Sequence, residues 1–151
     1  MITIIYFYKT NDEYGCFSNF AHYPFVVNGI TWHTSEHYFQ AHKFSDEEYF
    51  NKIRMTKSPM EAANLGRSRR IDIRDDWEDS KDNIMRKAVY EKFLQNKEIL
   101  DILLSTGTEE IVEATTNDYY WGCGIDGSGK NMLGKILMEV RDALKQHEAS
   151  D

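Results

Sequence analysis

The sequence is short of cysteine and proline, and it has no long hydrophobic run. The two thiols, Cys16 and Cys123, form no metal-like cluster, and reduced buried thiols fit a cytoplasmic protein. No apolar stretch approaches the ~20 residues that span a membrane. The first residues, Met1 to Tyr6, lack the basic segment and the small-residue cleavage site of a signal peptide. We therefore expect a cytoplasmic protein that does not contact a membrane.

Net positive charge is lacking as well. The formal net charge is −7, which argues against broad electrostatic binding to nucleic acid. Residues 52–74 depart from this balance, with a local charge of +5 that comes from seven bases against Glu61 and Asp72. A basic patch on an acidic protein suits a small anionic ligand better than a long polyanion, and a solvated loop is the alternative. The bases are Lys52, Arg54, Lys57, Arg67, Arg69, Arg70 and Arg74.

The hydrophobic periodicity predicts one helix-rich domain of the α+β class with a small antiparallel β element. A chain of 151 residues is long enough for one domain with its own core. We expect this domain over residues 1–145 and a flexible tail over 146–151. The β element is a hairpin over residues 25–32 around Asn28-Gly29. Other strands are expected over 2–8 and 110–115, and helices from Thr34, Ser45, Ser58, Ser80, Asn96 and Asn131, the last ending near Leu144.

The sequence is organised around residues 31–44, where a strand runs into a helix. Thr34 or Ser35 is placed to cap this helix. Successive helical residues are about 100° apart, so Glu36, Gln40 and Lys43 are expected to share a narrow polar stripe among aromatic residues. Glu36 and Lys43 would then lie roughly 10 Å apart along the axis, close enough to hold two parts of one small ligand. The alternative is a solvated face, with the aromatic residues turned to the core.

Residues 33–37 (HTSEH) match the inverted zincin pattern, in which two histidines bind zinc and the glutamate acts as base. His33 precedes the expected helix cap, so it would not share a face with His37, and a third protein ligand is missing. We therefore expect no metal. Cys16 and Cys123 are expected to be small core residues rather than nucleophiles.

Residues 122–127 fit the dinucleotide-binding pattern G-x-G-x-x-G, and residues 124–130 fit the phosphate loop G-x-x-x-x-G-K. Neither has the required context, because Asn131 replaces the Ser or Thr that binds magnesium and only one helix follows. What remains is a glycine loop whose bare N–H groups lead into a helix N-terminus, which is a natural site for an anion. A plain connecting loop is the alternative.

Several segments set polar side chains among aromatic ones. Aromatic faces with a few carboxylates and amides suit a flat heterocycle joined to a sugar, although each aromatic residue alone could belong to the core. The candidate substrate-binding residues are Phe17, Ser18, Asn19, Trp32, Gln40, Arg67, Trp121, Gly122, Gly127, Gly129 and Asn131.

A series of short blocks follows in order along the chain from Tyr6 to Arg141. The blocks are Phe17-x-Asn19-Phe20, Trp32-x-x-x-Glu36-His37-x-x-Gln40-Ala41-x-Lys43-Phe44, Gly66-Arg67, Thr106-Gly107, Glu113-Ala114 and Trp121-Gly122-x-Gly124-x-Asp126-Gly127-x-Gly129-x-Asn131-x-Leu133-Gly134. This series resembles the YbiA-like, or NADAR, family. The resemblance implies an α+β, helix-rich fold and N-glycosidase activity. Riboflavin-pathway members of this family hydrolyse the C–N bond of ribosylaminopyrimidine phosphates, and other members remove ADP-ribose from modified guanine in nucleic acid.

The chemistry assigns a role to each type of residue. Breaking a ribosyl C–N bond builds positive charge at the anomeric carbon, so a nearby carboxylate stabilises the transition state; Glu36 is the first candidate, followed by Asp118 and Asp126. A lysine kept neutral can form a Schiff base with the opened sugar, and the resemblance supports this role for Lys43. Arg67 and residues 127–131 would hold phosphate. Trp32 and Trp121 would stack on the base.

These roles require no cofactor and no metal. The expected partner is a small phosphorylated ribosyl-heterocycle, with release of ribose 5-phosphate. Nucleic acid would be a partner only if ADP-ribosylated guanine is the substrate, and the oligomeric state stays open. A non-catalytic module that binds ADP-ribose-like metabolites is the alternative from another class; it would be stabilised by its ligand without releasing base or sugar.

Overall fold

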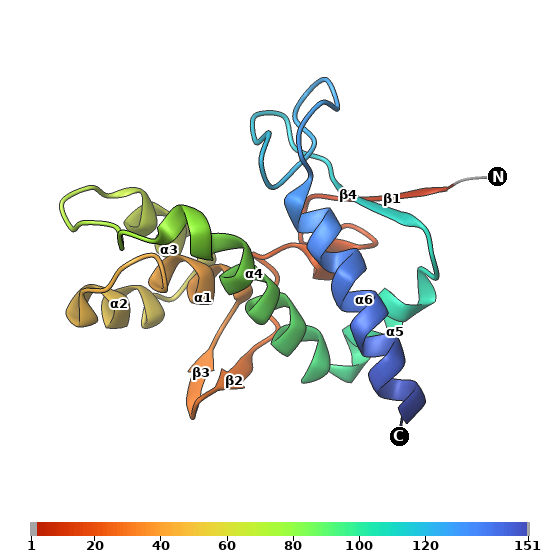
Figure 1. Ribbon diagram of the computed structural model, residues 1–151, viewed down its shortest axis with the longest axis horizontal. Helices are drawn as coiled ribbons and strands as arrows, with labels where there is room; N and C mark the ends of the chain where they lie inside the picture. The colour runs from red at the N-terminus through yellow and green to blue at the C-terminus, as the bar shows by residue number, and fades with distance from the viewer. Residues whose placement is uncertain (1–2, 151) are drawn as a thin grey trace.

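The computed structural model describes residues 3–150 and confirms a helix-rich α+β fold (Figure 1). Helices dominate, and the strands form two short two-stranded sheets. In chain order the elements are β1 (Ile4–Phe7), a short 3-10 helix η1 (Gly15–Phe17), β2 (Phe25–Val27), β3 (Ile30–Trp32), α1 (Ser35–Ala41), α2 (Glu47–Arg54), α3 (Pro59–Arg67), α4 (Trp77–Leu94), α5 (Lys97–Ser105), β4 (Glu110–Glu113) and α6 (Met132–Ser150).

Strands β2 and β3 form the predicted antiparallel hairpin. Phe25 lies opposite Trp32, and both side chains are buried. The turn residues Asn28 and Gly29 have φ values of 52° and 78°. A two-residue hairpin turn requires such left-handed values, and Asn and Gly adopt them at the least cost. The hairpin leads directly into α1, as the sequence predicted.

The second sheet pairs β1 with β4 in parallel, which was not predicted. Ile4 lies opposite Glu110, and Phe7 lies opposite Glu113. Alternate residues of β1 face the core, so Phe7 is buried while Tyr6 is exposed. Both strands lie within the segments predicted as strands, although residue 2 lies outside the described part of the chain. The pairing fixes Glu113 at the carboxyl end of β4.

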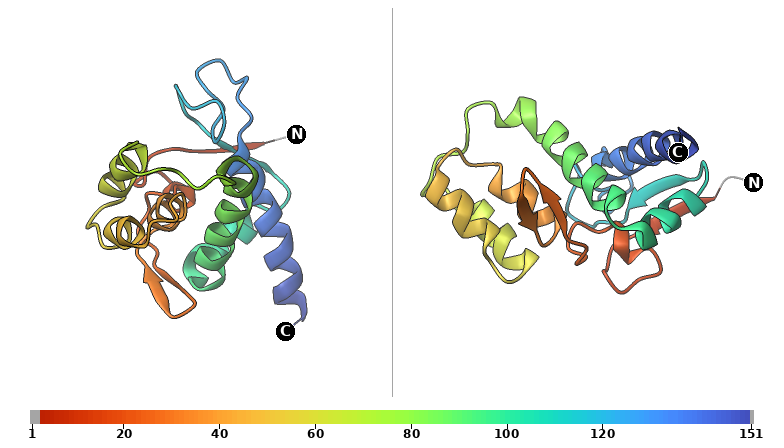
Figure 2. Two further views of the ribbon diagram at one scale, coloured as in Figure 1. Left: turned by 60° about the vertical axis from the view of Figure 1, so that its left-hand side comes forward. Right: turned by 90° about the horizontal axis from the view of Figure 1, so that it is seen from below.

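Helix α4 lies between two groups of elements and packs against both α1 and α6 (Figure 1, Figure 2). One group holds α1, α2, α3 and the hairpin, and the other holds α5, α6 and the parallel strand pair. The buried apolar side chains form two clusters, and Phe39 of α1 belongs to the cluster around Phe93. Two consecutive residues of α4 contribute to different clusters. Ala88 belongs to the cluster around Phe44, and Val89 belongs to the cluster around Phe93.

Helix α1 ends earlier than the sequence predicted. It begins after Thr34, whose side chain accepts the hydrogen bond of a helix cap. It ends at Ala41, so Lys43 lies in the following turn and not on a helical stripe with Glu36. The chain leaves the helix here because Phe44 forms a β-bridge with Ile73, a pairing that local sequence does not reveal.

Three other helix boundaries also differ from the prediction. Helix α3 continues through Gly66 and ends at Arg67, although Gly66 was expected to stop it. Helix α4 begins at Trp77 rather than at Ser80. Helix α6 ends at Ser150, where a tail was expected from residue 146; Asp151 lies outside the described residues. None of the helices within residues 3–150 is long and apolar enough to cross a membrane.

Candidate active site

The loop before α1 fixes the position of Glu36. The Asn19 carbonyl accepts a hydrogen bond from the Glu36 N–H at 3.2 Å. The Asn19 side-chain oxygen accepts one from the Ser35 hydroxyl at 2.8 Å. Ser18 is buried, and its hydroxyl accepts the Phe20 N–H at 3.1 Å. Of the two residues predicted as substrate contacts, Asn19 therefore supports the start of α1, and Ser18 orders the loop before it.

The Glu36 side chain is buried, and one neighbour on the same helix donates to it. Glu36 is 9% exposed, and the Gln40 amide donates a hydrogen bond to its carboxylate at 2.9 Å. Burial raises the pKa of Glu36, while the Gln40 hydrogen bond and the charges of Arg67 and Lys43 act in the opposite direction. The i, i+4 relation of Glu36 and Gln40 was predicted from the sequence.

Gly66 allows α3 to approach α1 at this point. A Cβ atom on Gly66 would overlap the Gln40 side-chain amide, so the close approach requires glycine. The Gln40 side-chain oxygen is buried here and has no hydrogen-bond partner within residues 3–150. The same contact brings the end of α3, with Arg67, close enough to Glu36 for its charge to act on the Glu36 carboxyl. Gly66 thus lets two of the predicted site residues, Gln40 and Arg67, lie close to Glu36.

Lys43 is held by its backbone in the turn after α1. Its N–H donates to the Gln40 carbonyl at 3.3 Å, and its carbonyl accepts the Arg74 N–H at 3.0 Å. The side chain is half-buried, with Nζ 6.0 Å from the centre of the Trp77 ring. The lysine therefore reaches the site from a turn fixed by tertiary contacts.

The surroundings of Lys43 disfavour its charged form. Burial lowers the pKa of the Lys43 ammonium, the positive charges of Arg69 and Arg67 lower it further, and Glu36 and Glu78 act in the opposite direction. Desolvation and cationic neighbours are the two causes that give a lysine a larger neutral, nucleophilic fraction. The lysine nitrogen and the Glu36 carboxyl are close enough to influence each other's titration.

Asp118 joins this group from the loop after β4. Its carboxylate accepts hydrogen bonds from the N–H groups of Tyr120 at 3.0 Å and Trp121 at 2.8 Å. The Thr115 hydroxyl donates to the Asp118 carbonyl at 2.7 Å. The negative charge of Asp118 raises the pKa of Glu36, which places the two predicted carboxylates in one neighbourhood.

Glu113 is a site residue that the sequence-based assignment of roles missed. Burial raises the pKa of this carboxyl to about 7, and the charges of Asp118 and Glu36 add to the shift. Its position depends on how β4 packs in the folded chain. The available signal was the block Glu113-Ala114 of the family resemblance, which lies shortly before Asp118. The site therefore contains three carboxyl groups, together with Lys43 and Arg67.

The glycine loop does not offer the bare N–H groups that were predicted. The N–H groups of Gly127, Gly129 and Asn131 donate to carbonyls at 3.3, 2.7 and 3.0 Å within the same segment. Asp126 is exposed, and its carboxylate accepts hydrogen bonds from the N–H and hydroxyl of Ser128. Within residues 3–150 these groups serve the loop itself, and the structure does not bring Asp126 to Glu36.

Asn131 precedes α6, but its side chain binds β4. The side-chain oxygen accepts the Glu113 N–H at 3.0 Å, and the side-chain amide donates to the Ile111 carbonyl at 2.9 Å. Asn131 has a φ of 53° and is buried. Gly122 is also buried, and its carbonyl accepts the Asn131 N–H. Both predicted ligand contacts therefore fasten the loop to the strand that carries Glu113.

Two of the aromatic residues predicted to contact substrate lie in the core. Trp32 is 1% exposed and packs edge-on against Tyr38, with ring centres 5.1 Å apart. Phe17 is 1% exposed, so neither ring presents a face to a ligand in this structure. Trp121 is half-buried, with its ring centre 5.2 Å from that of Phe39. Trp121 is the aromatic candidate that keeps exposed surface beside Asp118.

The two histidines of the HTSEH pattern have separate surroundings. His37 is buried, and its Nδ1 lies 2.7 Å from the Thr34 hydroxyl. Its Nε2 donates to the Thr56 carbonyl at 3.1 Å. His33 is exposed and lies before the helix. One ring nitrogen of His37 thus supports the cap of α1, and the other ties α1 to the segment between α2 and α3.

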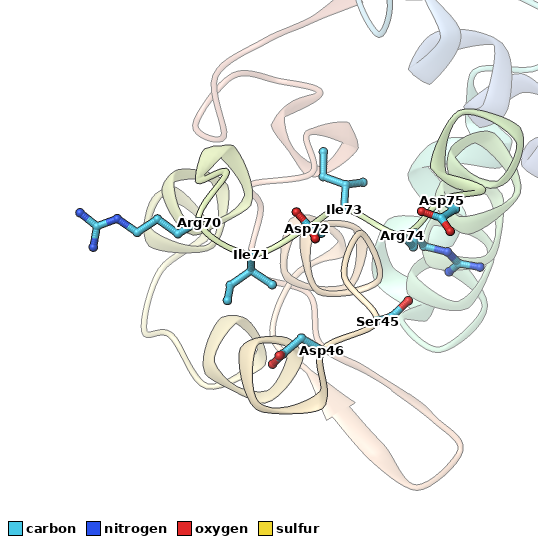
Figure 3. A pocket seen from close by; sticks show the side chains of 8 residues that line it. All are labelled: Ser45, Asp46, Arg70, Ile71, Asp72, Ile73, Arg74 and Asp75. Carbon is cyan, nitrogen blue, oxygen red and sulfur yellow. The ribbon is translucent and has the colours of Figure 1, made fainter.

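A shallow hollow of about 480 Å³ lies outside this group of residues (Figure 3). It is lined by residues 45–46 and 70–75. Arg74 is paired there with Asp76 at 2.6 Å, and Asp46 caps α2 by accepting the Tyr49 N–H. In the close view the Arg70 side chain extends away from the other lining residues. None of the eight lining residues is one of the predicted site residues.

Comparisons with known proteins agree with this fold. The sequence matches the NADAR domain over residues 6–145. N-glycosidase YbiA of Escherichia coli (strain K12) is 54% identical over 142 residues, covering 94% of this chain and 89% of that protein. A riboflavin biosynthesis protein of Vibrio vulnificus is 41% identical over 143 residues, covering 95% of this chain and 39% of that protein. The NMR structure of E. coli YbiA aligns with a TM-score of 0.92 at 51% identity, covering 100% of this chain and 90% of that one. The chain therefore belongs to the NADAR domain family.

Proposed function

We propose that this protein is an N-glycosidase that hydrolyses the C–N glycosidic bond of ribosylaminopyrimidine phosphates of riboflavin biosynthesis and releases ribose 5-phosphate. Family membership and the names of the E. coli and V. vulnificus relatives support a hydrolase acting on N-glycosyl bonds. The observation that carries the proposal is the pair of Glu36 and Lys43: a buried carboxyl beside a half-buried amine whose pKa is lowered.

Lys43 supplies the nucleophile in this proposal. The substrate carries an exocyclic amine on the anomeric carbon, so the ribose ring can open to an imine between that carbon and the pyrimidine amine. The neutral Lys43 amine adds to the imine carbon, and the aminopyrimidine leaves as the C–N bond breaks. Water then hydrolyses the lysine imine, which releases the ribose 5-phosphate aldehyde and restores the amine.

Glu36 and Asp118 stabilise the positive charge of these intermediates. An iminium group forms at the anomeric carbon before Lys43 adds and forms again after the aminopyrimidine leaves. A carboxylate held close to this positive group lowers its energy. Gln40 holds the Glu36 carboxylate, and the two backbone N–H groups hold Asp118, so neither side chain has to reorganise during the reaction.

Arg67 and Arg69 are the proposed phosphate ligands. Both lie at the end of α3 and are exposed, and both carry charges that act on Lys43. The Asn64 side chain accepts a hydrogen bond from Arg67 at 2.8 Å, and the Gly66 carbonyl accepts one from Arg69 at 3.0 Å. Guanidinium groups held in this way suit a phosphate monoester. We therefore do not assign phosphate to residues 127–131.

The test is the release of ribose 5-phosphate from a freshly prepared ribosylaminopyrimidine phosphate. We expect release by the wild-type protein, a loss of about 10³-fold or more in Lys43→Ala, and no change in the control Lys87→Ala, which alters an exposed lysine of α4. No release by the wild type would contradict the proposed substrate. Release from ADP-ribosylated guanine instead would assign the chain to the other activity, and thermal stabilisation by ADP-ribose without any release would indicate a binding module.

A further inference from the structure

We propose that Glu113 is the proton donor of the reaction: as a carboxylic acid, it protonates the ribose ring oxygen when the ring opens. This inference rests on the proposed function. It assigns a catalytic role to a residue that lies outside the pair of Glu36 and Lys43.

The backbone of Glu113 is held from both sides. Its N–H donates to the Asn131 side-chain oxygen at 3.0 Å. Its carbonyl accepts the N–H groups of Thr115 and Cys123, each at 3.0 Å. A residue fixed by three hydrogen bonds at the end of a strand can aim its side chain with little reorganisation. The loop that begins here also carries Asp118, so Glu113 and Asp118 are positioned together.

The Glu113 carboxyl differs from the two other carboxyl groups of the site in its hydrogen bonds. Glu36 accepts one from Gln40, and Asp118 accepts two from backbone N–H groups. No side chain or backbone group within residues 3–150 donates to the Glu113 carboxyl. N–H donors stabilise the ionised form of a carboxyl group, and Glu113 has none of them. Burial favours the protonated form of both Glu36 and Glu113. Of these two, Glu113 is the one whose carboxyl is held by no donor within residues 3–150, which leaves it open to a ligand.

The charges around Glu113 act in the same direction. Asp118 and Glu36 face it from the loop after β4 and from α1, and both raise its pKa, as burial does, to about 7. The positive charges of Lys43 and Arg67 act on Glu36 and lower its pKa. A donor with a pKa near the working pH is the most effective general acid. Glu113 therefore holds a proton that it can transfer at neutral pH.

The step balances without another reactant. The bond between the anomeric carbon and the ring oxygen breaks, and the ring oxygen takes the proton of Glu113. The lone pair of the exocyclic nitrogen forms the C=N bond, and the proton of that nitrogen returns to the Glu113 carboxylate. Glu113 leaves the step as it entered, and the open imine is ready for attack by Lys43.

The experiment compares the pH dependence of kcat/KM in the wild type, Glu113→Gln and Glu110→Gln. Glu110 is exposed on the same strand and serves as the matched control. The neutral form of Lys43 increases with pH, so we expect the kcat/KM of Glu113→Gln to rise with pH. The kcat/KM of the wild type and of the control should bend downward from this rise above about pH 7, because the acid form of Glu113 is lost there. Glu113→Gln should lose about 100-fold or more at pH 6 and lack this bend.

Activity of Glu113→Gln within threefold of the wild type, or an unchanged pH profile in this variant, would overturn the assignment. A wrong overall function would give a different result from a wrong role of Glu113, because the wild type itself would then release no ribose 5-phosphate. If Glu113→Gln does not fold, ¹³C NMR of labelled glutamate in the wild type decides the matter. A Glu113 carboxyl that titrates near 7 supports the role, and one that titrates below 5 overturns it.

Discussion

At the scale of single residues, hydrogen-bond donors distinguish the acidic groups of the site. Glu36 depends on one donor, the Gln40 amide, and that amide in turn packs against Gly66. Gly66 leaves room for the Gln40 amide and so preserves the hydrogen bond to the Glu36 carboxyl on another helix. We expect Gly66 to contribute more to function than to stability.

Gly66→Ala should impair activity more than stability. The new methyl group would push the Gln40 amide away from Glu36, while alanine in a helix gains about 0.5–1 kcal/mol over glycine, which offsets part of the strain. We expect the free energy of unfolding to change by about 1 kcal/mol or less and turnover to fall roughly 10-fold. Urea unfolding and steady-state kinetics measure the two effects.

A double-mutant cycle isolates this cause. In a Gln40→Ala background the clash is removed, so adding Gly66→Ala should have little further effect on turnover. An equal loss of turnover in both backgrounds would show that Gly66 acts on the site without Gln40.

At the scale of elements, the site is assembled at the ends of helices and strands. The sequence predicted the start of α1 at Thr34, because a cap and the first helical turn are set by neighbouring residues. The same reasoning predicted that Glu36 and Gln40 lie on one face of the helix, where the structure shows a hydrogen bond between them. It placed Lys43 wrongly on the stripe, because the end of α1 depends on the bridge between Phe44 and Ile73, about 30 residues apart.

The predicted roles of Glu36 and Lys43 depended on the family resemblance. Once the resemblance indicated a glycosidase, carboxylate chemistry pointed to Glu36, and the resemblance supported the role of Lys43. Trp32 and Asn131 were assigned to the ligand because stacking and amide groups suit it, yet both side chains are used inside the protein. Glu113 stands in the block Glu113-Ala114 of the resemblance but was given no role, because its buried environment comes from the packing of β4.

At the scale of the whole molecule, α4 joins two clusters of apolar side chains and also carries a buried lysine. Lys92 is 1% exposed, and its ammonium donates to the Ser18 carbonyl at 2.9 Å. It thereby anchors the loop that holds Asn19 and, through it, Glu36. The parallel pairing of β1 with β4 belongs to this scale as well, since its partners lie more than 100 residues apart and could not be predicted locally.

Lys92 should make stability depend on pH. Burial lowers its pKa in the folded state to about 7, against about 10.4 in the unfolded chain. Between these values the unfolded chain binds more protons, so the free energy of unfolding should rise with pH. We expect Lys92 to contribute a rise of about 1 kcal/mol between pH 7 and 8, and Lys92→Met to lack it.

Urea unfolding at the two pH values measures this difference. Lys87→Met, which alters an exposed residue of the same helix, should keep the wild-type dependence. If Lys92→Met kept that dependence as well, another group would be responsible.

The central claim is that Lys43 forms a covalent bond with the sugar, and borohydride trapping tests it most directly. Borohydride reduces a lysine imine to a stable amine, so peptide mass spectrometry after turnover locates the adduct. We predict that the wild type gains the mass of ribose 5-phosphate less one oxygen atom on Lys43, and that Lys43→Arg, which keeps the charge, gains nothing. Rapid release of ribose 5-phosphate with no adduct, or an adduct on another lysine, would contradict the account.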